Sequence, residues 1–200
     1  MLTPELMPKS SFLDFGSPEM PTYSLTAQPL DEEVGYQQLD AYLQRERYKK
    51  ELAGLARIDD DALVGRLVDA GFSANTLPAL PLAPIAFVAW ASNSVSERES
   101  QAVIASIFES QLYRRPAAAA RVQSWLDQRP TQALWQLWVD YTKKRLECAS
   151  IKQRKIAGAR LLRQATQVAL ASGGFMGLGS VCAAENEVLE SIRNVFHRQF

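Results

Sequence analysis

The sequence predicts an all-α protein, a compact bundle of seven to eight helices, and three observations lead to this prediction. Apolar residues recur at three- and four-residue steps from about residue 31 to the end of the chain. Prolines, acidic residues and Ser or Thr stand where these periodic segments begin. No stretch of useful length alternates between apolar and polar residues, as a half-buried strand would.

The composition is that of an ordinary globular domain. The chain has 200 residues, of which 47% are hydrophobic and 22% are charged. Its 22 basic and 22 acidic residues balance to a net charge of zero, whereas proteins that bind nucleic acid through many phosphates are strongly basic. We therefore expect no nucleic-acid partner. Two cysteines and one histidine argue against a disulfide scaffold, the usual zinc sites and a histidine-based catalytic triad.

Residues 1–29 are predicted to form a flexible arm. Five of the ten prolines lie in this segment, and their spacing prevents a helix from propagating. We expect the arm to be dispensable for folding; a second interpretation, in which its aromatic residues dock on the domain or on a partner, stays open. Residues 30–200 are predicted to form a single helical domain.

The first half of this domain contains four predicted helices. The first begins at Asp31–Glu33, where acidic side chains favour the unpaired amides of a helix start. The second follows Asp59–Asp61 and ends at Gly71. The third begins near Pro84, within the apolar and proline-containing stretch Leu77–Ala91, and the fourth starts at Ser96 with a Ser-x-x-Glu capping pattern. The apolar positions expected to face the core are Leu39, Tyr42, Leu43, Leu52, Leu55, Leu63, Leu67, Val68, Ile85, Phe87, Val88, Trp90, Val103, Ile104, Ile107, Phe108 and Leu112.

The second half contains four more predicted helices. Pro116 and Pro130 place prolines in the first turns of the fifth and sixth helices. Ser150 caps a seventh helix from Ile151 to about Ala171, and the last helix begins near Ala183. The apolar positions expected inside are Leu134, Leu137, Trp138, Tyr141, Leu161, Leu162, Ala165, Val168, Val188, Leu189, Ile192, Val195 and Phe196.

Two long uncharged stretches, residues 70–96 and 164–184, are expected not to span a membrane. Prolines interrupt the first and glycines the second, and a span needs about 20 uninterrupted apolar residues. The chain also does not open with the basic and apolar runs of a secretory signal. The expected location is the cytoplasm.

A short motif occurs twice, as Ser-Val-x-x-x-Glu at residues 94–99 and again at residues 180–185. Each copy follows an Ala-rich apolar helix and precedes an amphipathic one, which predicts a pseudo-repeated helix–loop–helix unit. With the alanines before each loop, the pattern resembles the tellurite-resistance TerB-like family over roughly residues 77–200. The matching positions are Ala89, Ala91, Val95, Glu99, Ala169, Ala171, Val181, Glu185 and Leu189.

The resemblance implies a compact helical domain, acidic loops that bind divalent cations, and a part in stress-response and membrane-associated complexes. This chain departs from the family where the family has Asp-Gly, because it has Ser92-Asn93 and Ser172-Gly173 instead. Hard cations need several charged oxygen ligands. We therefore expect no bound metal, and we assign Glu99 and Glu185 to helix caps. A divalent-cation sensor with unusual ligands stays as the alternative function.

The partner-binding site is predicted on the seventh helix, where four basic residues share an arc of about 140° opposite the apolar residues. These four are Lys152, Lys155, Arg160 and Arg163. We expect them to bind a protein partner of unknown identity; a solvated face without a partner and peripheral association with an anionic membrane both stay open. The Gly-rich segment 173–179 adds Phe175 and Met176 as candidate contacts.

The sequence does not place a nucleophile beside a base. We therefore predict a non-enzymatic domain without catalytic residues or a cofactor.

Overall fold

The computed structural model describes residues 32–171 and 181–197, with side chains from residue 35 onward. These residues form eight α-helices and two short 3-10 helices and contain no strand, so the predicted all-α fold is confirmed. The elements are α1 (Glu32–Ala56), α2 (Asp61–Asp69), η1 (Leu77–Leu82), α3 (Ala83–Ala89), α4 (Glu97–Glu109), η2 (Leu112–Arg114), α5 (Pro116–Asp127), α6 (Gln132–Glu147), α7 (Ile151–Ala171) and α8 (Ala183–His197). The chain divides into two compact units, residues 1–38 and 39–200. The predicted arm, residues 1–29, lies outside the described residues.

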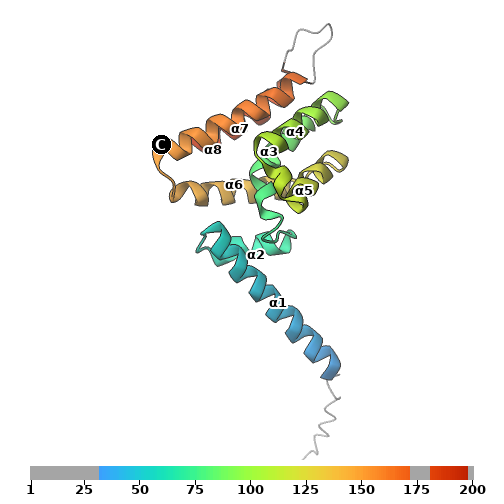
Figure 1. The fold of residues 1–200 in the computed structure, drawn as a ribbon, viewed down its shortest axis with the longest axis vertical. Helices are drawn as coiled ribbons and strands as arrows, with labels where there is room; N and C mark the ends of the chain where they lie inside the picture. The colour runs from blue at the N-terminus through green and yellow to red at the C-terminus, as the bar shows by residue number, and fades with distance from the viewer. Residues whose placement is uncertain (1–31, 172–180, 198–200) are drawn as a thin grey trace, which may run out of the picture. The chain divides into compact units, whose positions relative to one another are not determined.

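α3 is the central element of the second unit (Figure 1). It contacts η1 and the helices α4, α5, α6, α7 and α8. The segment Leu77–Ala89 has no charged residue, and its prolines at positions 78, 81 and 84 favour the start of a helix. Five of the seven residues of α3 have no exposed surface, so this stretch is buried as predicted.

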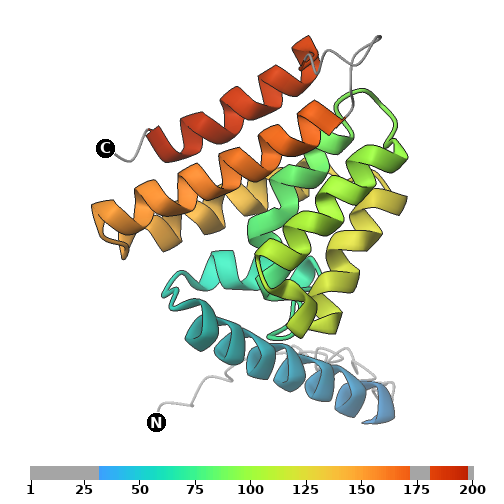
Figure 2. The same ribbon diagram turned by 45° about the horizontal axis from the view of Figure 1, so that its top comes forward.

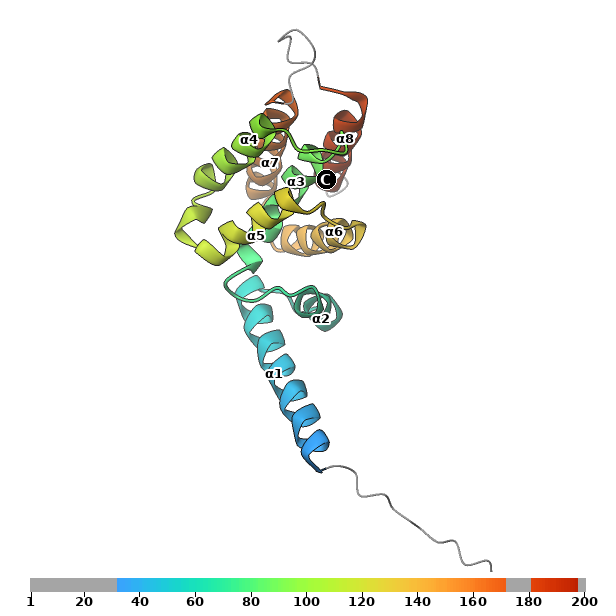
Figure 3. The ribbon, with the colours of Figure 1, turned by 90° about the vertical axis from the view of Figure 1, so that its right-hand side faces the viewer.

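α7 and α8 run side by side in opposite directions (Figure 2), and both contact α3. α4 lies along α7 (Figure 3), so the helix pairs α3–α4 and α7–α8 pack on each other. Gly158 permits the close approach of α7 and α8, because a Cβ atom at this position would lie 3.0 Å from the ring of Phe196.

The repeated motif forms the same capping structure at the starts of α4 and α8. The backbone amide of Ser96 donates to Glu99 Oε2 (2.7 Å), and the Glu99 amide donates to Ser96 Oγ (3.3 Å). In α8 the Cys182 amide donates to Glu185 Oε2 (2.7 Å), and the Glu185 amide donates to Cys182 Sγ (3.4 Å). The two glutamates are only 2% and 1% exposed. Their assignment to helix caps is confirmed.

The tryptophans of α5 and α6 belong to the core. Trp138 has no exposed surface, and Trp125 is also buried. Trp135 is half-buried between the rings of Phe87 (5.1 Å between centroids, edge-on) and Trp138 (5.0 Å). These aromatic contacts join α6 to α3 at the centre of the domain.

The predicted inward face of α1 is wrong. Leu39, Tyr42, Leu43 and Leu55 are exposed, and of the predicted set only Leu52 is buried. The reason is that only one narrow strip of residues 39–56, the part of α1 in the second unit, is covered by other residues, so the apolar side chains elsewhere on this part of the helix stay exposed.

Charged residues fix that strip of α1 to α2. Lys49 is buried and its Nζ lies 2.8 Å from Asp61 Oδ2, while the Arg45 guanidinium binds Asp69 at 2.9 Å. The hydrogen bond to Asp61 raises the pKa of Lys49, so this cation keeps its charge despite its burial. Ion pairs, which periodicity does not show, therefore supplement the apolar contacts of α1.

Two smaller expectations also differ from the structure. Phe108 is 59% exposed, and at the surface its ring stacks on that of Tyr113 in η2, with 5.5 Å between the ring centroids. Pro130 precedes α6 rather than lying in its first turn, since Thr131 caps the helix by accepting a hydrogen bond from the Leu134 amide.

Candidate functional site

All four basic residues of the predicted arc are exposed on α7, but they divide into two pairs. Arg163 forms an ion pair with Glu109 at the end of α4 (2.8 Å), and Arg160 donates to the Glu109 main-chain carbonyl. Lys152 and Lys155 have no ion pair or side-chain hydrogen bond to any part of the chain that the structure describes. The second pair is therefore available to a partner, while the first holds α4 on α7.

Two neighbouring cavities of about 650 Å³ and 470 Å³ lie beside α7, and we call the two together the α7 groove. The residues that line both cavities are Pro81, Tyr141, Arg145, Gln153, Ala157 and Leu161. Its walls come from η1, α6 and α7, with further residues from the ends of α1 and α8 and from the segment around η2.

The walls of the α7 groove are partly apolar, and all of its charged side chains are positive. Its charged residues are Arg57, Arg115, Arg145 and Arg160, and no Asp or Glu lines either cavity. The guanidinium groups of Arg57 and Arg115 make no ion pair or hydrogen bond with other described residues, whereas Arg145 donates to the carbonyl of Ala56 (2.7 Å). Arg160 lies close to the Glu109 carboxylate, whose pKa its charge helps to lower, so Arg57 and Arg115 are the groove arginines that favour an anionic ligand group.

Tyr141 supplies a neutral hydrogen-bond donor where the two cavities meet. Burial raises the pKa of its phenol, and the positive charge of Arg145 opposes this only in part. The phenol therefore keeps its proton near neutral pH and can donate to a carboxylate or a carbonyl oxygen.

Ile156 connects the α7 groove to the basic arc. It lines the groove, is 57% exposed, and lies within the arc on the helical projection of α7. A partner's apolar side chain could thus be buried on Ile156 while its carboxylates reach the lysines beside it. The sequence analysis missed this residue, and its signal was an apolar side chain inside a basic arc.

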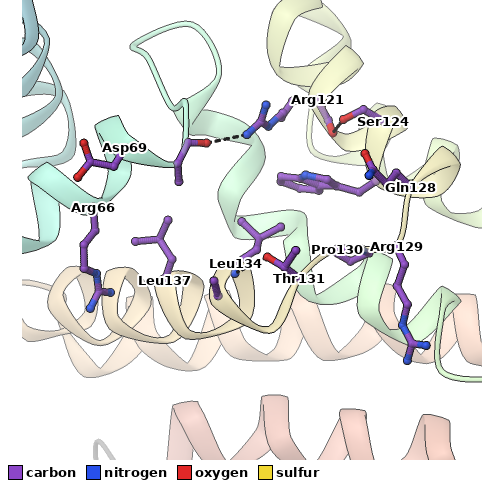
Figure 4. Close-up of a pocket in the computed structure, with 13 residues that line it drawn as sticks. Arg66, Asp69, Arg121, Ser124, Gln128, Arg129, Pro130, Thr131, Leu134 and Leu137 are labelled. Atoms are coloured by element: carbon purple, nitrogen blue, oxygen red, sulfur yellow. Dashed lines mark hydrogen bonds between the residues drawn. The ribbon is translucent and has the colours of Figure 1, made fainter.

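A further cavity of about 560 Å³ lies between α2, α5 and α6 (Figure 4). The arginines that line it are Arg66, Arg121 and Arg129. Their guanidinium groups bond to Asp140 (2.6 Å), the Ala70 carbonyl (2.8 Å) and Asn93 (2.8 Å), respectively. Because these arginines are engaged in holding segments of the domain together, this cavity is the weaker candidate for an anionic ligand.

The remaining predictions concern two contact residues, a metal ion and a membrane span. Phe175 and Met176 lie outside the described residues. Within residues 32–171 and 181–197, no group of three or more His, Cys, Asp or Glu side chains is arranged to hold a metal ion. The helices described there are also too short or too polar to cross a membrane.

Comparison with protein-family models, curated proteins and solved structures finds no match to this chain. The resemblance to the TerB-like family therefore rests on the two loop motifs alone.

Proposed function

We propose that this protein is a non-enzymatic helical domain that binds an acidic protein partner through α7. The observation that carries the proposal is the exposed surface formed by Lys152, Lys155 and Ile156, in which two unpaired cations lie beside an apolar side chain on the same part of α7. Exposed apolar residues beside unpaired charge suit a partner that presents both carboxylates and an apolar anchor.

The chemistry of the α7 groove supports a binding role rather than catalysis. Its lining combines arginines and apolar side chains with neutral polar ones, and it includes no carboxylate or imidazole, the groups that most often act as general bases. Because the net charge of the whole chain is zero, an acidic patch on a protein partner suits it better than a long polyanion such as nucleic acid.

Membership of the TerB-like family, a cytoplasmic location and a part in a stress-response assembly belong to the same proposal. The matching capping structures of α4 and α8 support it, because the family resemblance centres on those two loops. The alternative, a divalent-cation sensor, has weaker support. One oxygen of Glu99 and one of Glu185 already accept hydrogen bonds in the helix caps, and both side chains are buried.

The test is affinity capture from a cell lysate with the wild-type chain and the double variant Lys152→Glu/Lys155→Glu, followed by mass spectrometry. A protein captured by the wild type is then purified, and its affinity for both chains is measured. We expect the variant to bind at least tenfold more weakly, and the wild-type affinity to fall as salt screens the charges over about 8–10 Å.

The matched control is Arg47→Glu/Lys50→Glu, which makes the same charge change on the exposed side of α1. We expect this control to retain the wild-type affinity. Equal binding by the α7 variant and the wild type would contradict the proposed function.

A further inference from the structure

We infer that the α7 groove holds an acidic amphipathic peptide segment of the partner, with its apolar side chains on the groove walls and its carboxylates on the arginines. This inference rests on the proposed function and specifies which surface the partner occupies. The outer lysines of α7 would contact the partner beside this segment.

The first argument is charge. Four arginines line the groove without a carboxylate among the lining residues, although the chain as a whole contains equal numbers of acidic and basic residues. Arg57 and Arg115, which belong to different cavities, are the two whose guanidinium groups have no bonding partner among the described residues. Carboxylates spaced along an extended or helical segment would complement one arginine in each cavity.

The second argument is the surface between the arginines. Leu77, Pro78 and Leu112 provide apolar walls in the larger cavity, and Tyr141 provides a hydrogen-bond donor where the two cavities join. Apolar anchors give such a complex affinity, while a fixed donor contributes to its orientation.

The third argument is access. Leu55 and Ile156 line the groove and are 47% and 57% exposed, so macromolecules can reach these walls. A peptide segment that covers both residues removes apolar surface from water, which stabilises the complex by about 25 cal/mol for each Å² buried.

The experiment is selection from a displayed library of random 12-residue peptides on the immobilised full chain. We expect the enriched peptides to combine several Asp or Glu residues with aliphatic or aromatic ones. Synthetic copies should bind the groove variant Arg57→Glu/Arg115→Glu at least tenfold more weakly than the wild type. They should bind the control Arg47→Glu/Lys50→Glu within about twofold of the wild type, because all four substituted side chains are exposed.

The apolar walls are tested with Ile156→Ser, which keeps all charges and should weaken the same peptides at least threefold. Circular dichroism of each variant shows whether it is folded. Failure to enrich any peptide, or enriched peptides without acidic residues, would overturn the inference.

Two other outcomes separate this inference from the proposed function. If acidic peptides lose affinity for Lys152→Glu/Lys155→Glu but not for the groove variant, the partner binds the outer face of α7 alone and only the inference fails. A second outcome is that no peptide is selected, while the wild type binds phosphatidylcholine vesicles containing phosphatidylglycerol and the groove variant does not. The groove then faces a lipid surface and the inference is wrong.

Discussion

At the scale of single residues, Glu109 links α4 to α7. Its carboxylate accepts hydrogen bonds from Arg163 (2.8 Å) and from Gln164 (3.2 Å), and its main-chain carbonyl accepts one from Arg160. The hydrogen bond from Arg163 holds the pKa of Glu109 below its ordinary value. The interaction therefore stabilises the fold above the ordinary pKa of a glutamate and is lost as the pH falls through the lowered value.

Substitution of Glu109 tests this link. We expect Glu109→Gln to reduce the free energy of unfolding by about 0.5–1 kcal/mol at pH 7, the range for partly exposed ion pairs. The difference from the wild type should shrink as the pH falls through the lowered pKa of Glu109, because the wild-type carboxylate then also becomes protonated. Urea melts over a series of pH values from neutral to acidic measure this. A pH-independent difference would show that lost packing, not charge, explains the effect.

Substitutions of Trp138 and Lys152 test which helix faces are buried and which are exposed. Trp138 has no exposed surface and lies against Trp135, so Trp138→Ala should lower the free energy of unfolding by about 3–5 kcal/mol. Lys152 is exposed without an ion pair among the described residues, and Lys152→Ala should change stability by no more than about 0.5 kcal/mol. Denaturant melts of both variants give the comparison, and equal effects would mean that the helix faces are misassigned.

Residue roles were predictable from the sequence where they depend on neighbours along the chain. The caps at Glu99 and Glu185 follow from a three-residue spacing, which brings the side chain back to the start of its own helix. The exposure of Phe108 and Ile156 depends instead on whether another element covers that side of the helix. Periodicity cannot supply that information.

At the scale of elements, α7 carries three surfaces. Leu161, Ala165 and Val168 face the core, the basic arc is exposed, and Gln153 and Ala157 line the α7 groove, which overlaps the arc at Ile156 and Arg160. The sequence analysis recognised the first two surfaces, because apolar and basic residues separate on the helical projection. The groove was missed, because its opposite walls come from η1 and α6.

Gly158 tests the packing of α8 on α7. We expect Gly158→Val to destabilise the protein by about 1–3 kcal/mol, because its side chain would overlap the ring of Phe196. The matched control is Gly54→Val in α1, where nothing lies within 4 Å of the added Cβ. The control should stay within about 0.5 kcal/mol of the wild type, since valine and glycine differ little in helix propensity. Thermal melts that rank the two variants equally would contradict the close contact.

The bounds of the helices were predicted better than their orientation. α7 begins and ends where the sequence indicated, with Ser150 accepting a hydrogen bond from the Gln153 amide (3.3 Å) at its start. The prediction of the buried face of α1 was wrong, because apolar spacing predicts a helix but not whether a second element packs against it.

At the scale of the whole molecule, the α7 groove depends on tertiary structure. Residues from the segments 77–82, 138–146 and 153–164 line it, and along the chain α3, α4 and α5 lie between the first segment and the second. Neither arginine available to a partner there, Arg57 or Arg115, belongs to the basic run seen in the sequence. A site assembled from such distant segments could not be read from local patterns.

The most direct test of the central claim is hydrogen–deuterium exchange of the full chain with and without the partner obtained by affinity capture. Binding at α7 and its groove predicts slower amide exchange in residues 77–82 and 151–161, with α2 and α5 unchanged. Protection confined to α2, α5 and the start of α6, around the cavity of Figure 4, would contradict the account.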